Sequence, residues 1–169
     1  MPELTSKDRL QPSLLDRLTD EDPEKATESR DKRVLSMEDL RRCVMRDIAW
    51  LFNAGNLASV QDLDDHPLVA ESVVNFGLPE LAGVSANGLD RGVLERMVRQ
   101  AIWNFEPRIL RHTVKVRAFV SEDLMSRNAL AFIIEGELWG QPLPTRLYLR
   151  TEIDLDTGNV AVSETAPSG

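Results

Sequence analysis

The ten residues AIWNFEPRIL, positions 101–110, mark the point where the sequence changes from helical to strand-like periodicity. Apolar residues recur every three or four positions before this stretch and alternate with other residues after it. Pro107 lacks a backbone donor and restricts Glu106 to extended geometry, so the helix is predicted to end at about Phe105 or Glu106. If Glu106 and Arg108 are both extended, their side chains point to one face and form a polar junction between a helix and a sheet.

Two long amphipathic helices are predicted before this junction. The first covers residues 37–53, because Ser36 and Asp39 have the spacing of a capping box and an apolar stripe follows them. The second, the main helix, begins after Asp90, which is predicted to be its N-cap. The apolar stripe of the main helix consists of Leu94, Met97, Val98, Ala101, Ile102 and Phe105. This stripe indicates a helix that packs on a core.

The stretch between the two helices carries shorter signals. Pro67 is predicted to open a helix of one to two turns that runs through Val74 and is closed by Gly77. Four residues just before it invite a metal interpretation: Asp62, Asp64, Asp65 and His66. Their spacing matches no EF-hand loop, and acidic residues before a helix are more typical of caps, so no metal site is predicted.

Four strand-like runs follow the junction, at about 113–120, 130–134, 147–153 and 160–162. The second run is apolar on both faces and is therefore predicted to be central, whereas the short last run is predicted to be an edge strand. The fold class predicted from this order is α+β. N-terminal helices precede an antiparallel sheet of three to four strands that packs on the main helix.

Composition limits the possible functions. The chain has 169 residues, 42% of them hydrophobic, and a formal net charge of −8, which argues against nucleic acid as the main partner. Cys43 is the single cysteine, so an intramolecular disulfide and an all-cysteine metal site are excluded and a reducing, cytoplasmic setting is expected. No stretch is apolar over the length of a signal peptide or a membrane span, so the protein is expected to be neither exported nor membrane-spanning. No cofactor is predicted.

The N-terminal part differs in composition from the rest. Leu14, Leu15 and Leu18 form an apolar stripe on a short helix that needs a surface to lie on. Ten of the fourteen residues at 20–33 are charged, which is typical of a solvated linker. We therefore divide the chain into a docking helix with its linker at 1–33, a domain at 34–164 and a disordered tail at 165–169. Whether the helix docks on a partner or folds back on the domain stays open.

Charge is unevenly distributed along the chain. Residues 90–117 carry seven Lys and Arg against three Asp and Glu, in an otherwise acidic protein. This basic band could attract an acidic protein surface to the junction. The band could equally be neutralised by carboxylates of the protein itself.

The sequence resembles the sheath-initiator, lysozyme-like baseplate proteins of contractile injection machines, in particular the TssE family of type VI secretion subunits. Five segments carry the resemblance in order: QPSLLDRL (11–18), RDIAWLFN (46–53), SVVNFGLPEL (72–81), FEPRI (105–109) and IDLDTG (153–158). Together they span almost the whole chain, and each of them alone is a weak signal. The Glu, Pro, Arg triplet of the fourth segment makes the resemblance more specific.

The resemblance implies a structural wedge subunit and not an enzyme. It places Glu106, Pro107 and Arg108 at a junction that the contractile sheath needs in order to assemble, and it implies strand exchange with sheath neighbours at a sheet edge. The implied partners are wedge subunits of the TssF, TssG and TssK type and sheath subunits of the TssB and TssC type. The implied location is cytoplasmic, at the membrane-docked baseplate. Leu14, Leu15 and Leu18 are the candidates for docking to the wedge.

Two alternatives remain at the junction. Arg108 either holds a partner's carboxylate or carbonyl groups, or forms an internal salt bridge that pins the main helix to the first strand. The lysozyme-like label also raises a peptidoglycan-cleaving glycosidase, with Glu106 and either Glu135 or Glu137 as the carboxyl pair. An adjacent guanidinium favours an ionised carboxylate, whereas a general acid must hold its proton, so we do not favour the glycosidase.

Overall fold

The computed structural model describes residues 13–19, 24, 36–82, 90–119, 128–139 and 144–165. Residues 166–169 of the predicted tail at 165–169 and most of the linker at 20–33 lie outside the described residues. The helical elements are α1 (Leu14–Leu18), α2 (Met37–Asn53), η3 (Leu57–Ser59), α3 (Pro67–Ala70), η4 (Val73–Asn75), α4 (Arg91–Phe105) and η6 (Arg111–Thr113). The strands are β1 (Lys115–Phe119), β2 (Ala129–Leu138), β3 (Thr145–Asp154) and β4 (Val160–Glu164).

Both long helices begin at the predicted caps. The Ser36 hydroxyl accepts a hydrogen bond from the Asp39 N–H at 3.0 Å, and the Asp39 carboxylate accepts one from the Ser36 N–H, which completes a capping box on α2. The Asp90 carboxylate accepts hydrogen bonds from the N–H groups of Gly92 and Val93 at the start of α4. These bonds satisfy donors that have no partner within the helix, and so they fix where each helix starts.

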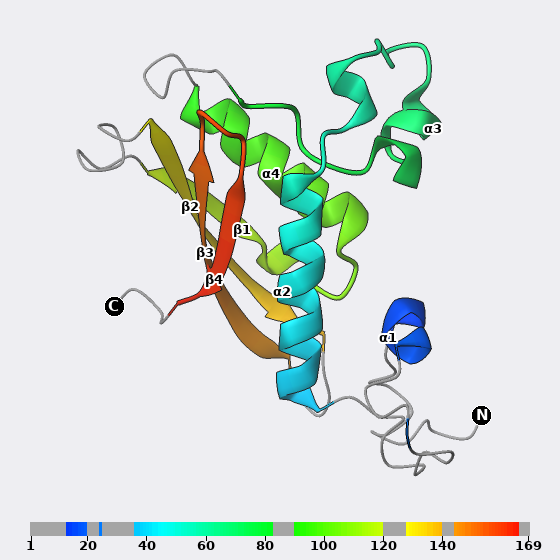
Figure 1. The fold of residues 1–169 in the computed structure, drawn as a ribbon, viewed down its shortest axis with the longest axis vertical. Coiled ribbons are helices and arrows are strands. Elements are labelled where there is room, and N and C mark those ends of the chain that lie inside the picture. The colour runs from blue at the N-terminus through cyan, green and yellow to red at the C-terminus, as the bar shows by residue number, and fades with distance from the viewer. Residues whose placement is uncertain are drawn as a thin grey trace.

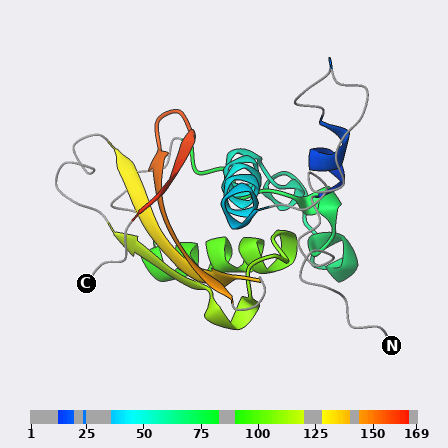
Figure 2. The same cartoon turned by 90° about the horizontal axis from the view of Figure 1, so that it is seen from below.

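The four strands form one antiparallel sheet in the order β1-β2-β3-β4. The helices α2 and α4 cover one face of this sheet, as Figures 1 and 2 show from two directions. The core between the two layers holds alternate residues of the strands and the apolar stripes of both helices. Its most buried strand residues are Leu130, Phe132, Ile134, Leu138, Leu147, Leu149 and Ile153. The predicted α+β class, the central position of β2 and the edge position of β4 are confirmed.

The structure corrects several predicted boundaries, and β2, for example, continues beyond Ile134 to Leu138. The helix opened by Pro67 ends at Ala70, and η4 is a separate 3-10 turn. Ser72 causes the break, because its hydroxyl donates to the Val69 carbonyl and accepts from the Val74 N–H, in competition with the helical backbone. The strand expected from residue 113 starts at Lys115, after the turn η6. Among the described residues, no helix is long and apolar enough to cross a bilayer.

Candidate functional site

The junction after α4 is a turn that is tied to the sheet. Glu106 has φ −124° and ψ 76°, and its carbonyl accepts a hydrogen bond from the Ile109 N–H at 3.2 Å. Pro107 and Arg108 therefore sit in a turn, and the fully extended geometry considered for Arg108 is not formed. The Arg108 carbonyl accepts a hydrogen bond from the Trp139 N–H at 2.7 Å, which joins the turn to the end of β2.

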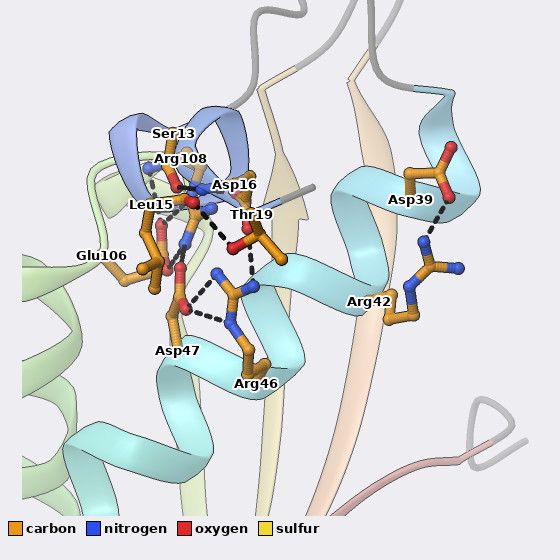
Figure 3. A network of polar contacts seen from close by, with 10 residues as sticks. All are labelled: Ser13, Leu15, Asp16, Thr19, Asp39, Arg42, Arg46, Asp47, Glu106 and Arg108. Atoms are coloured by element: carbon orange, nitrogen blue, oxygen red, sulfur yellow. Dashed lines mark hydrogen bonds and ion pairs between the residues drawn. The ribbon is translucent and has the colours of Figure 1, made fainter. Parts of the chain in front are cut away.

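Two carboxylates hold the guanidinium of Arg108 (Figure 3). Its Nε donates to Glu106 Oε1 at 2.7 Å and its Nη2 donates to Glu106 Oε2 at 2.5 Å, a bidentate pair. The same Nη2 donates to Asp47 Oδ2 on α2 at 2.6 Å. Planar two-point pairing is the strongest geometry available to arginine and a carboxylate. Arg108 therefore braces the turn against α2, whereas the internal salt bridge considered from sequence joined the main helix to the first strand.

Burial distinguishes this pair from a surface salt bridge. The side chain of Glu106 is 3% exposed and that of Arg108 is 24% exposed. Burial lowers the pKa of Arg108, but hydrogen bonding and charge attraction from Glu106 and then Asp47 outweigh it, so the pKa lies above its ordinary value. Nη1 of Arg108 is buried and has no hydrogen-bond partner among the described residues. The guanidinium is thus permanently charged, and one of its nitrogen atoms is buried without a hydrogen bond to any described residue.

The network continues from the junction to the N-terminal helix (Figure 3). Arg46 Nε donates to Asp47 Oδ1 at 2.8 Å, and Arg46 Nη1 donates to Asp16 Oδ1 on α1 at 2.5 Å. Burial raises the pKa of Asp16, but the hydrogen bonds from Arg46 and Ser13 and the charge of Arg46 outweigh it, so this pKa is lowered. Alternating charges therefore run from α1 through α2 to the turn.

The leucines of α1 do not hold this helix in place. Leu14 is 71% exposed, Leu15 is 46% exposed and Leu18 is 74% exposed. The helix is anchored by the Asp16 to Arg46 ion pair instead. The helix therefore lies back against the domain, close to the junction, but through an ion pair and not through its leucines, which stay largely in solvent.

A groove of about 430 Å³ lies between α1, α2 and the turn. Its polar lining contains Arg46, Asp47, Glu106 and Arg108, and its apolar lining contains Leu15, Ile48, Trp50, Leu51, Phe76, Phe105 and Pro107. The rings of Phe76 and Phe105 meet edge to face at 5.3 Å and stiffen one wall. Pro107, an exposed residue of the triplet, and Leu15 of α1 thus share one groove.

The second candidate feature is the edge of the sheet formed by β4. The Tyr148 carbonyl accepts from the Thr165 N–H, and the Asp154 N–H donates to the Asn159 carbonyl, which fixes the hydrogen-bonded pairs between β3 and β4. Alternation in an antiparallel ladder then directs the main-chain N–H and C=O groups of Val160, Val162 and Glu164 outward. The edge therefore presents backbone groups that the sheet does not use.

One end of this edge is already occupied by a side chain. The Asn53 amide donates to the Val160 carbonyl at 2.9 Å, and its oxygen accepts from the Val160 N–H at 2.9 Å, as a neighbouring strand would. No described residue makes a hydrogen bond with the outward backbone groups of Val162 or Glu164. These two residues form the open part of the β4 edge.

The opposite edge, β1, is closed differently. The Ala118 N–H donates to the Glu95 carboxylate on α4 at 2.8 Å, and α4 packs along β1. A carboxylate bonded to an edge strand blocks the addition of another strand there. A helix also packs beside β4, since α2 contacts that strand and its Arg41 pairs with the Glu164 side chain, so what distinguishes β4 is the backbone groups of Val162 and Glu164 that no described residue binds.

The carboxyl groups considered for glycoside hydrolysis are separated. Glu135 and Glu137 line a hollow with Lys115, Arg146 and Tyr148, whereas Glu106 lines the groove beside α2. Both oxygens of Glu106 accept hydrogen bonds from Arg108. A glycosidase pair must face one cleft, and its general acid must hold a proton, so this arrangement does not suit that reaction.

The acidic residues before α3 serve the local backbone. Asp62 Oδ1 accepts a hydrogen bond from the Asp64 N–H at 2.9 Å. Within the described ranges, no three His, Cys, Asp or Glu side chains gather in an arrangement that could hold a metal ion.

Sequence reasoning missed four residues of the site, Asp16, Arg46, Asp47 and Asn53. Asp47 lies three residues after Val44 and four before Leu51, so its side chain belongs to the apolar face of α2. An acidic residue on such a face is a signal that it pairs with a buried cation. Asn53 is the last residue of its helix, where a polar residue is common, and no sequence signal distinguishes its contact with β4 from an ordinary helix end.

One of three comparisons with known proteins found a match. A comparison with protein families matches residues 38–143, more than half of the 169 residues, to the family described as baseplate wedge protein gp25. The matched region contains all of α2 except Met37, and α4, the Glu106 to Arg108 turn, β1 and β2. Neither the curated proteins nor the solved structures gave a match. The chain therefore belongs to the baseplate wedge protein gp25 family, a structural family of baseplate components.

Proposed function

We propose that this baseplate wedge protein is the type VI secretion subunit that initiates polymerisation of the contractile sheath. The observation that carries the proposal is the open edge at Val162 and Glu164, beside an Asn53 amide that already imitates a pairing strand. A strand from a sheath subunit can add to such an edge through main-chain bonds alone. The first sheath ring would then be aligned by the sheet of the wedge.

The junction has a different part in this proposal. Glu106, Pro107 and Arg108 fix the direction in which the sheet leaves α4, because the turn is bonded to α2 on one side and to β2 on the other. The groove beside the turn combines an exposed proline, aromatic walls and charged groups, a composition typical of protein interfaces. We propose that wedge subunits of the TssF, TssG and TssK type bind there, while sheath subunits of the TssB and TssC type bind the β4 edge.

The N-terminal helix supplies a second wedge contact. Leu14 and Leu18 are largely exposed and lie on a helix that the domain holds mainly by one ion pair. Residues 1–33 would therefore act as a docking arm, and 34–164 as the domain that carries the junction and the sheet. The complex would assemble in the cytoplasm, at a membrane-docked baseplate.

The experiment replaces a residue of the open edge. Val162→Pro removes an outward N–H that no bond of the fold uses, so the sheet should persist while an incoming strand loses a hydrogen bond. Val162→Thr keeps the N–H and serves as the matched control. With baseplates reconstituted around each variant, electron microscopy should show few sheaths with the proline variant and normal numbers with the threonine variant.

The outcome that contradicts the proposal is specific. If the proline variant melts at the temperature of the unaltered protein and still starts sheaths at the normal rate, strand addition at β4 is not the initiating contact. If it melts much earlier, the comparison must be repeated with Val162→N-methylated valine, introduced by ligation, which removes the same donor without fixing φ.

A further inference from the structure

Another surface, distinct from the β4 edge, is formed by residues 56–78, of which Phe76 alone also lines the groove. This segment, which we call the lobe, contains η3, α3 and η4. It lies on the side away from the sheet in both views (Figures 1 and 2), and Figure 1 shows it beyond the end of α2. Two backbone hydrogen bonds close its base, from the Asn56 N–H to the Leu78 carbonyl at 3.0 Å and from the Leu78 N–H to the Ala54 carbonyl at 2.9 Å.

The lobe is internally fixed. The buried side chain of Asn75 accepts a hydrogen bond from the Ala58 N–H at 2.9 Å and donates one to the Ala70 carbonyl at 2.8 Å, which joins its three short helices. At its base, Gly77 has φ +126°, and a side chain there would come within 2.3 Å of the Ala54 carbonyl oxygen. A loop held by a buried amide and a left-handed glycine presents its outer side chains in a defined arrangement.

Apolar side chains of the lobe differ widely in burial. Leu63 and Leu78 are buried, and Leu78 joins the core of the protein, with Phe76 packed against that core. Four others are exposed to solvent: Val60 (83%), Leu68 (85%), Val73 (80%) and Val74 (65%). Single exposed apolar residues are ordinary, but these four lie within fifteen positions of one fixed segment, a concentration that favours a protein contact. None of them serves the core, since each is at least 65% exposed.

Charge on the lobe identifies the kind of partner. Residues 56–78 contain four carboxylates, Asp62, Asp64, Asp65 and Glu71, and no Lys or Arg. All four are exposed. Such a surface is repelled by the anionic face of a membrane and by nucleic acid phosphates. It is complementary to a protein surface that is apolar at its centre and carries Lys or Arg at its rim.

We infer that the lobe is a protein-docking surface, and that its partner is another baseplate subunit with a basic-rimmed apolar face. The lobe uses neither the Arg108 turn nor the β4 edge, so this contact is independent of sheath initiation. It gives the wedge protein a third attachment point, fixed in direction by the bonds of Asn75 and by the base at Leu78.

The test uses the full-length protein and the purified wedge subunits of its own machine. In Leu68→Ser/Val73→Ser/Val74→Ser, side chains that contact solvent are replaced, so the melting temperature should stay unchanged. Affinity for the wedge subunits should fall by about tenfold or more, as for the loss of a central apolar contact. Val93→Ser, an exposed apolar residue on α4, is the matched control.

A second variant tests the charge of the lobe. Asp64→Lys/Asp65→Lys should weaken binding mainly at low salt, since rim charges are screened.

Cross-linking identifies what lies on the surface. With p-benzoylphenylalanine in place of Leu68, illumination of the assembled wedge should attach the lobe to a segment of another subunit that contains Lys or Arg beside apolar residues. The same substitution at Glu152, on the outer face of the sheet, should give a different product or none.

A cross-link to a second copy of this chain, binding of the lobe to phosphatidylglycerol vesicles, or unchanged wedge affinity of the triple variant would each overturn the inference. Full sheath assembly by the triple variant, together with lost wedge affinity, leaves the proposal for β4 intact.

Discussion

Replacing Arg108 with alanine tests the account of the junction most directly. The substitution removes the only side-chain cation that contacts Glu106 among the described residues, and it also removes one partner of Asp47. Glu106 keeps a single hydrogen bond, from the backbone N–H of residue 108 at 3.1 Å. A buried carboxylate would then face its groove without a counter-charge.

The structure sets the size of the effect. Breaking a fully buried pair costs about 3–5 kcal/mol, because the remaining ion is left uncompensated. Arg108 is 24% exposed, so solvent screens part of the loss, and we expect the free energy of unfolding to fall by about 2–4 kcal/mol. For a chain of this size, each kcal/mol corresponds to about 2–4 °C, so the melting temperature should drop by roughly 5–15 °C.

Thermal and urea denaturation followed by circular dichroism measure this loss. Arg150→Ala is the matched control, because Arg150 also pairs with a carboxylate, Glu152, but both side chains are more than 40% exposed. The control should change stability by less than about 0.5 kcal/mol. Arg108→Lys should lie between the two, since it keeps the charge and loses the two-point geometry.

A double variant separates charge burial from lost packing. In Glu106→Gln/Arg108→Met the carboxylate and the cation are removed together, so the double variant should be more stable than Arg108→Met alone. If Arg108→Ala melts within 2 °C of the unaltered protein, or if the double variant is the less stable, the buried pair does not brace the junction and the reasoning above is wrong.

Three further predictions concern α1 and the base of the lobe. Asp16→Asn should release α1 and increase the rate at which Cys43, buried and hydrogen-bonded to Asp16, reacts with a thiol reagent; an unchanged rate contradicts anchoring by this ion pair. The pKa of Asp16 is lowered in the folded protein, so the stabilisation from this carboxylate is complete above the ordinary value of 3.8 and is lost as the pH falls through the lower folded value. Thiol reactivity, measured by mass spectrometry at equal reagent exposure, should therefore show α1 releasing only in that acidic range. Gly77→Ala should cost roughly 2 kcal/mol or more in urea denaturation because of its positive φ and the close Ala54 carbonyl, whereas Gly55→Ala, with nothing near its added carbon, should change little; equal losses would refute the conformational argument.

The sequence predicted the elements well because the signals for them are local. Ser36 with Asp39 and the cap at Asp90 place the starts of α2 and α4, and Pro107 places the end of α4. The helix at Pro67 was predicted too long, because the competing hydroxyl of Ser72 acts through side-chain hydrogen bonds that periodicity does not register.

The site shows a similar division. Glu106 and Arg108 are close in sequence, and their pairing follows from short-range geometry. Asp47 reaches the same guanidinium from 61 positions earlier in the chain, and Asn53 reaches Val160 across 107 positions. Contacts over such separations depend on how α2 packs, which no local pattern contains.

The sequence by itself determined the α+β class, the caps, the proline corner and the order of helices and strands, because spacing and local hydrogen bonding decide these features. Only the tertiary structure decided that α2 supplies the second carboxylate to Arg108, that α1 is anchored by Asp16, and that β4 keeps an open edge. The physical reason is that these features arise when separate elements meet, and the free energy of that packing is a property of the assembled core.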